Sequence, residues 1–196
     1  MSRVKQAELI KQMSSKEITF HLLITQVVLL LIAIVLSLIF FSSPLEQWIK
    51  LFEVQFPEWV LFGVIPGLIV ISVDFLLIAL LPERYYDDGG INKKVFENQS
   101  VLKIFLITLL IAICEEALFR GVLQTQFGFV IASTLFALIH FRYLKKVVLF
   151  VSVLFVSYFI GYIFHITGSL PITITSHFLI DFLLGLWIYS RSGEGN

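Results

Sequence analysis

The sequence has few charged residues and only one cysteine. Asp, Glu, Lys and Arg make up 14% of its 196 residues, whereas a soluble domain is usually about one quarter charged. With 58% hydrophobic residues and a mean hydropathy of +0.95, the composition predicts an all-α integral membrane protein. The single cysteine, Cys114, excludes a disulfide within the chain. Because the net charge is zero and no nucleic-acid-binding motif is present, the expected partner is the lipid bilayer and not nucleic acid.

Six apolar stretches predict about six transmembrane helices, at residues 20–41, 59–81, 101–126, 129–143, 147–166 and 172–189. A helix needs about 20 residues to cross a bilayer, so the short fourth stretch is expected to tilt or to lie in thinned bilayer. The first stretch exceeds the roughly 7–15 apolar residues of a signal-peptide core, and no small-x-small cleavage site follows it. We therefore interpret it as a retained span.

A long polar break at residues 82–100 divides the sequence. We expect a cytoplasmic segment at 1–19, a two-span section at 20–99 and a four-span core at 100–190. Apolar residues at helical spacing between the first two spans favour a helix lying flat on the outer membrane surface, with an ordinary connecting loop as the alternative. These residues are Leu45, Trp48, Ile49, Phe52 and Phe56.

The basic residues predict the orientation, because cytoplasmic segments carry an excess of Lys and Arg. Apart from Arg120 inside the third span, the opposite-side segments hold only Lys50. The other twelve fall on one side: Arg3, Lys5, Lys11, Lys16, Arg84, Lys93, Lys94, Lys103, Arg142, Lys145, Lys146 and Arg191. The expected localisation is a multi-pass protein of the cell membrane with both termini in the cytoplasm.

The third span carries two acids and an arginine where a membrane helix should be apolar. One charge at the centre of a bilayer costs about 2.5–3.5 kcal/mol on insertion scales, so such residues indicate a functional site. Glu116 and Arg120 are four residues apart, on one helix face, and are expected to form an ion pair. Glu115 points about 100° away and has no partner on its own helix. We therefore interpret Glu116 as the structural acid and Glu115 as the chemical one.

Two later spans contribute further polar groups. His140 ends the fourth span, while His177 and Asp181 share a face of the sixth. If the chain turns near residues 127–128, Glu115 and His140 each lie about 18–20 Å from the turn at 1.5 Å per residue. His177 and Asp181 lie about 9 Å and 15 Å into their span by the same rise. The four groups are therefore expected to meet at one cavity.

The chemistry of this set is that of activated water. No GxSxG, Ser-Lys or Cys-His arrangement supplies a nucleophile, and no HExxH zinc helix is present. A carboxylate can activate water, while the imidazoles act as partner base, oxyanion donors or metal ligands. A divalent metal such as zinc would take its ligands from Glu115, His140, His177 and Asp181. Hydrolysis of a peptide or membrane-protein substrate is the simplest reaction that uses every group.

Three motifs in order resemble those of the CPBP family, also called Abi, which includes the type II CAAX prenyl endopeptidases and the bacteriocin-processing and immunity proteins. The motifs are Glu115-Glu-x-x-x-Arg120, Phe136-x-x-x-His140 and His177-x-x-x-Asp181. Their flanks, Ala117-Leu-Phe-Arg-Gly-Val-Leu123 and Thr167-Gly-Ser-Leu-Pro171, also resemble the family's, so the likeness covers about residues 100–190.

The resemblance implies an intramembrane endopeptidase in which Glu115 and His140 activate water while His177 and residue 181 stabilise the oxyanion. Members are often called metalloproteases, although a metal-free glutamate mechanism is also argued. The last motif usually ends in Asn, and here it ends in Asp181. Since an ionised aspartate cannot donate a hydrogen bond, three roles stay open: a protonated donor, an orienting partner of His177, or a metal ligand. Prenylated C-termini, peptide pheromones, bacteriocin leaders and misfolded membrane proteins are all compatible substrates.

Other interpretations are open. The motif residues could form a packing network, a non-catalytic immunity or regulatory protein could use them for binding, or a small transporter could use them as a proton relay. The lack of inverted repeats counts against the transporter. Asp74, inside the second span, is either a helix-packing contact or a peripheral cavity residue, with Lys103 as a candidate partner. We interpret Cys114 as a small apolar residue, and His21 and His165 as interfacial side chains.

Overall fold

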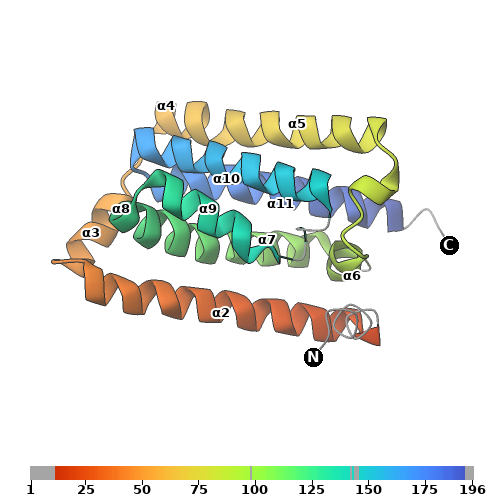
Figure 1. Ribbon diagram of the computed structural model, residues 1–196, viewed down its shortest axis with the longest axis horizontal. Coiled ribbons are helices and arrows are strands. Elements are labelled where there is room, and N and C mark those ends of the chain that lie inside the picture. The colour runs from red at the N-terminus through yellow and green to blue at the C-terminus, as the bar shows by residue number, and fades with distance from the viewer. Residues whose placement is uncertain (1–11, 98, 142, 144–145, 193–196) are drawn as a thin grey trace.

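The computed structural model describes residues 12–97, 99–141, 143 and 146–192, and over these residues it contains helices and no strand (Figure 1). Many of these helices are rich in β-branched residues, which favour strands in water. Within a bilayer, however, each backbone N–H and C=O must find a partner inside the protein, and a helix provides one locally. The predicted class, an all-α integral membrane protein, is therefore confirmed.

The structure has eleven α-helical and 3₁₀-helical segments among the described residues, together with two π-helical segments, η1 and η3. In chain order they are α2 (Ser15–Phe40), α3 (Pro44–Leu51), α4 (Phe56–Glu58), η1 (Trp59–Val64), α5 (Ile65–Leu80), η2 (Glu83–Tyr85), α6 (Ile91–Phe96), α7 (Val101–Glu116), η3 (Ala117–Gln124), α8 (Thr125–Phe127), α9 (Phe129–Ile139), α10 (Val147–Thr167) and α11 (Leu170–Ser192).

Local signals set several helix ends. Ser14 caps α2 in a capping box with Glu17, and the Ser100 hydroxyl accepts a hydrogen bond from the backbone N–H of Lys103 at the start of α7. Gly128 lies between α8 and α9 with φ of 86°, a conformation that glycine adopts at little cost. The turn expected at residues 127–128 is therefore present, and it makes α7, η3 and α8 antiparallel to α9.

Four helical stretches of the described chain are long and apolar enough to cross a membrane: Ser15–Phe40, Phe56–Leu80, Val147–Thr167 and Leu170–Arg191. The acid-bearing stretch is not among them, and Phe129–Ile139 is a shorter apolar helix. The predicted count of six is thus not confirmed. The fourth predicted span is also shorter than expected, because α9 ends at Ile139 and not at residue 143.

The helices form a bundle with α2 and α5 on opposite sides and α7, α9, α10 and α11 between them (Figure 1). Helix α11 packs against α7, α5, η1 and α10, whereas α2 packs against α7 and η3. From Val27 to Phe40 the exposed side chains of α2 are apolar, and Leu31 and Leu38 are more than half exposed, as expected of a helix that contacts lipid. The protein is therefore a multi-pass membrane protein.

The start of α2 and the end of α11 lie at the same end of the bundle, together with α6 (Figure 1). This arrangement agrees with the expectation that both termini are on one side of the membrane. Which side that is stays a prediction. Five of the basic residues that predict the orientation lie outside the described residues: Arg3, Lys5, Lys11, Arg142 and Lys145.

The predicted stretch contains a helix, α3, at the other end of the bundle from α6 (Figure 1), but α3 ends at Leu51, so Phe52 and Phe56 lie outside it. Leu45 and Ile49 are exposed, while Trp48 faces inward. The Trp48 ring lies 6.0 Å from that of Phe41, and a Cβ on Gly121 would lie 3.0 Å from the indole. Trp48 thus joins α3 to the core, and the position of α3 on a membrane surface stays a prediction.

Candidate active site

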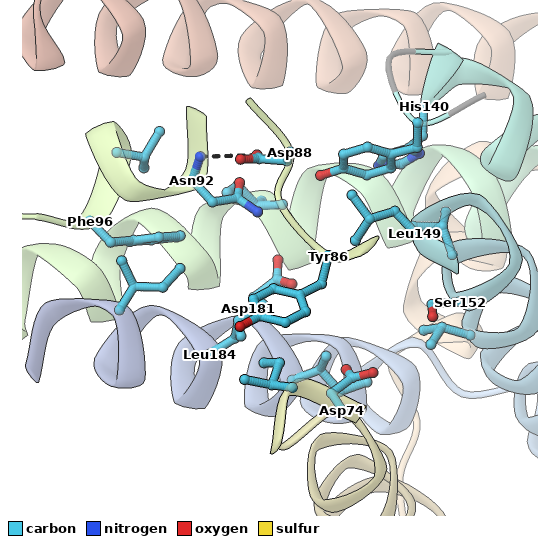
Figure 2. A pocket seen from close by; sticks show the side chains of 18 of the residues that line it. Asp74, Tyr86, Asp88, Asn92, Phe96, His140, Leu149, Ser152, Asp181 and Leu184 are labelled. Carbon is cyan, nitrogen blue, oxygen red and sulfur yellow. Dashed lines mark hydrogen bonds between the residues drawn. The ribbon is translucent and has the colours of Figure 1, made fainter. Parts of the chain in front are cut away.

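The three motifs meet around one cavity of about 640 Å³. Glu115 comes from the end of α7, Arg120 from η3, His140 from the C-cap of α9, and both His177 and Asp181 from α11. Figure 2 shows the side chains of His140 and Asp181 among those that line this cavity. The convergence that the depth estimate predicted is therefore present, although the roles of these residues stay predictions.

Glu116 is fully buried at the centre of a polar network. Its Oε2 lies 3.5 Å from Nε of Arg120, and its Oε1 lies 2.9 Å from Nδ1 of His177. Neither Glu116 nor Arg120 is exposed to solvent. Arg120 also donates from Nη2 to the backbone carbonyl of Ser157 on α10, at 3.0 Å. The predicted ion pair is present, and through it Glu116 links α7, η3, α10 and α11.

The π-helical segment η3 begins at the residue after Glu116 and contains Arg120. Such segments insert an extra residue into a helix, and they occur frequently at functional sites. The four-residue spacing of Glu116 and Arg120 predicts a regular α-helix here, whereas the segment is π-helical. The Glu116–Arg120 pair forms nonetheless, because both residues still face the interior between α10 and α11.

Glu115 is 8% exposed and has different neighbours. Its Oε1 accepts a hydrogen bond from Nε2 of Gln26 on α2, at 3.2 Å. Its Oε2 lies 4.0 Å from Nε2 of His177. Glu115 therefore faces the cavity while Glu116 contacts Arg120 and His177, and the separate roles predicted for the two acids stay predictions.

His177 lies among three carboxylates. Its Nδ1 contacts Glu116, and its Nε2 lies 3.5 Å from Oδ2 of Asp181 and 4.0 Å from Oε2 of Glu115. A ring that donates from Nδ1 to Glu116 has its other nitrogen directed at the cavity. Positive charge on this ring would be offset by the carboxylates around it.

The ring of Phe136, from the second motif, contacts residues of all three motifs. The guanidinium of Arg120 lies 4.7 Å from the ring centroid, within the range of a cation–π interaction. The rings of His140 and His177 have centroids 5.0 Å and 5.9 Å from it. In the sequence, only the four-residue spacing before His140 distinguishes Phe136 from the other phenylalanines.

His140 follows the last residue of α9, so it lies at a helix end and not inside a span. Its Nδ1 lies 2.8 Å from the carbonyl of Phe136, and its ring stacks on Tyr143. If Nδ1 donates to that carbonyl, Nε2 is the nitrogen left for chemistry. His140 therefore lines the cavity with its ring held by two contacts.

Residues outside the motifs also line the cavity. Asp74 on α5 is one of them, which favours the peripheral cavity role over a helix-packing contact (Figure 2). Its candidate partner Lys103 is exposed, and no ion pair joins the two among the described residues. Gln26 was missed altogether, because its contact with Glu115 spans 89 residues of sequence. The long polar break contributes a wall of the cavity through Tyr86 and Asn92.

Three further residues were considered in the sequence, and the interfacial position predicted for His21 and His165 stays a prediction. Cys114 is fully buried, on the same helix as Glu115. His165 packs its ring against Phe129 and Tyr162, and His21 lies beside Phe20 near the start of α2. None of these three residues lines the cavity.

The expected metal ligands do not gather as a metal ion requires. A metal site in a protein commonly takes three or more side-chain ligands, and no group of three His, Cys, Asp or Glu residues is suitably placed within the described chain. Nδ1 of each histidine is held, by Glu116 for His177 and by the Phe136 carbonyl for His140, so only Nε2 of each ring could bind a metal. As arranged, these residues do not fit a metal, and chelation is the test of whether the protein needs one.

Comparison with known proteins assigns the family. Residues 97–183 match the family described as type II CAAX prenyl endopeptidase Rce1-like. The chain is also 42% identical over 157 residues to the Bacillus subtilis (strain 168) protein described as uncharacterized protein YpbD, covering 80% of this chain and 82% of that one. No solved structure matches it. With its three motifs gathered at one cavity, the chain belongs to the Rce1-like family of type II CAAX prenyl endopeptidases, within the CPBP group.

Proposed function

We propose that the protein is an intramembrane endopeptidase that hydrolyses a peptide bond in or near the membrane, with Glu115 as the general base. The observation that carries the proposal is the different environment of the two adjacent acids. Glu116 is held by Arg120 and His177, whereas Glu115 faces a cavity beside an imidazole. A carboxylate placed in this way can accept a proton from water.

The reaction would proceed by attack of water on the scissile carbonyl. Glu115 takes one proton from the water, and the water oxygen bonds to the carbonyl carbon to give a tetrahedral oxyanion. The C–N bond then breaks, and the proton held by Glu115 passes to the leaving amine. Glu115 returns to its carboxylate, and the products are a new carboxyl terminus and a new amine.

His177 and His140 would support these steps from two sides. A His177 ring that donates from Nδ1 to Glu116 can donate from Nε2 to the oxyanion when both nitrogens carry protons. His140, held through Nδ1, directs Nε2 to the cavity as the partner of Glu115 in activating water. Asp181 lies on the cavity side of His177 and is 30% exposed, within reach of a substrate.

The side of entry follows from the orientation that we propose. The cavity wall includes Tyr86, Asp88 and Asn92, which belong to the segment between α5 and α7 (Figure 2). That segment carries Arg84, Lys93 and Lys94, so the positive-inside rule assigns it to the cytoplasm. A substrate would therefore enter from the cytoplasmic side of the cell membrane.

The test is a cleavage assay with purified protein in detergent, using an internally quenched farnesylated CAAX peptide and its unprenylated form. The parent protein should cleave at least one, with products identified by mass spectrometry, and Glu115→Ala should cleave neither. If the folded parent protein cleaved neither peptide nor a panel of membrane-protein substrates, the regulatory alternative would replace the protease.

A further inference from the structure

Gln26 reaches the candidate site from a helix outside the segment that matches the family model. It lies on α2, whereas the match begins at residue 97. Most of the surface of α2 is apolar and faces outward, yet Gln26 is only 4% exposed and lines the cavity. A polar side chain at this depth of a membrane helix indicates a functional contact.

The contact fixes one oxygen of the proposed base. Nε2 of Gln26 donates to Oε1 of Glu115 at 3.2 Å, and the other oxygen of Glu115 is the one that lies 4.0 Å from Nε2 of His177. If the amide were turned over, its oxygen would face the carboxylate and repel it. The N–H therefore holds Glu115 in the rotamer that presents Oε2 to His177 and to the cavity.

Helix packing alone does not explain this glutamine. Oε1 of Gln26 is buried and accepts no hydrogen bond from the described residues, although a glutamine selected for packing would be expected to satisfy both ends. The docking of α2 is supplied by apolar contacts, in which Ala33 is fully buried and Leu29 and Leu36 pack against the same core. Hydrogen bonds between membrane helices also add little stability on average.

We propose that Gln26 is a positioning residue for Glu115, which it orients toward the scissile bond through its amide N–H. The inference rests on the proposed function of Glu115 as base. It assigns part of the site to α2, which the three motifs do not include. Because Gln26 acts through Glu115, its loss should lower turnover and leave substrate binding unchanged.

The test compares three variants of the full chain in detergent. Gln26→Met keeps the length of the side chain and removes the donor, and Gln26→His restores an N–H of similar reach. Ser37→Ala is the matched control, because Ser37 is buried on the same helix and its hydroxyl donates within that helix, to the carbonyl of Ile34. The measurements are kcat and KM on whichever peptide the parent protein cleaves, and the melting temperature of each variant.

We expect Gln26→Met to lose about 10–100-fold in kcat with KM unchanged, the usual effect of removing a supporting partner. Gln26→His should recover part of that loss, and Ser37→Ala should match the parent protein. The proposal is overturned if Gln26→Met keeps the parent kcat, or if it melts at a lower temperature while its folded fraction turns over normally. A Gln26→His variant as slow as Gln26→Met would also count against it.

The proposed protease function fails independently of the Gln26 proposal if the parent protein cleaves no peptide. The contact is then tested by a thermal cycle with Gln26→Met, Glu115→Leu and the double variant. Residues in contact give shifts that do not add. Additive shifts in melting temperature would overturn the contact on which the positioning role depends, and coupled shifts would support that contact.

Discussion

Nδ1 of His177 lies 2.9 Å from Oε1 of Glu116, on a helix that is separated from α7 by more than fifty residues of sequence. The same carboxylate lies 3.5 Å from the guanidinium of Arg120. Glu116 is therefore committed to both neighbours and cannot face a substrate. Its neighbour Glu115, held from the other side by Gln26, keeps one oxygen directed at the cavity. The two adjacent acids therefore have different surroundings: Glu116 lies inside the buried network, and Glu115 lies at the cavity.

This difference predicts opposite results for two matched substitutions. Glu115→Gln should abolish peptide cleavage and leave the melting temperature close to that of the parent protein, because an amide fills the same space beside Gln26. Glu116→Gln should instead lower stability by about 3–5 kcal/mol, since it leaves the buried Arg120 without its counter-charge. Thermal unfolding in detergent and the peptide assay measure the two effects separately.

Arg120→Leu is the companion variant, and it should destabilise the protein as Glu116→Gln does. Near-normal turnover by Glu115→Gln in a working assay would show that Glu115 is not the base. A stable and fully folded Glu116→Gln would instead remove the structural role of Glu116.

A substitution at Asp181 tests the departure from the usual asparagine. Glu116 is fully buried, and its Oε1 lies 2.9 Å from Nδ1 of His177. Asp181 is 30% exposed, and its Oδ2 lies 3.5 Å from Nε2 of His177. The ring is therefore oriented chiefly by Glu116. Asp181→Asn should therefore keep or raise activity, because the amide N–H can donate to an oxyanion, whereas a carboxyl group donates only when it is protonated. Asp181→Ala should lose activity in the same assay.

A loss of about 10–100-fold in Asp181→Asn would instead indicate that the carboxylate orients His177 or binds a metal. If Asp181→Asn and Asp181→Ala both matched the parent protein, the third motif would act only in packing. The two variants together thus distinguish donor, orienting and packing roles.

Phe136 is predicted to support the site through its ring. Phe136→Leu keeps the residue apolar but removes the face that the Arg120 cation lies over, an interaction worth about 0.5–2 kcal/mol. It also removes a ring contact from each of His140 and His177. We expect a lower melting temperature and reduced kcat, whereas Phe155→Leu, at a position that is 62% exposed, should change neither.

The sequence was sufficient to predict the features that depend on regular spacing. The four-residue interval predicted the Glu116–Arg120 pair, and a constant rise per residue placed Glu115 and His140 at one cavity. The glycine at position 128 marked the turn between α8 and α9. These features follow from one helix or one hairpin at a time, so a single sequence contains the information for them.

Features that depend on the lateral order of helices could not be predicted. The spans are apolar on all sides, so periodicity does not show which face meets which neighbour. The contacts of Gln26 with Glu115 and of Arg120 with Ser157 join helices far apart in sequence. The early end of α9 was also missed, because no glycine or proline follows Ile139 to mark a helix end.

Metal dependence is the next prediction. Because the four expected ligands do not gather as arranged, we expect EDTA or 1,10-phenanthroline to leave peptide cleavage unchanged. The control is a zinc protease treated in the same detergent, which should lose activity. An activity that disappears with chelator and returns only with added zinc would reverse this expectation and assign Glu115, His140, His177 and Asp181 to a metal site.

The orientation of the bundle decides from which side a substrate reaches the cavity. The bias of twelve basic residues against one predicts that α3 is outside and that the segment between α5 and α7 is cytoplasmic. Single cysteines can be introduced in a Cys114→Ala background, at Ser43 before α3 and at Glu83 in η2. Both positions are exposed, and Ser43 makes no side-chain capping bond that the substitution would remove.

In intact cells an impermeant maleimide should label the Ser43→Cys variant and leave the Glu83→Cys variant unlabelled until the membrane is permeabilised. Labelling of both before permeabilisation would indicate a leaky membrane, which a cytoplasmic marker protein controls for. The reversed pattern would overturn the orientation. Because Glu83 lines the cavity, the reversed pattern would also place the entrance of the cavity outside the cell. An exported peptide would then be favoured over a cytoplasmic C-terminus as the substrate.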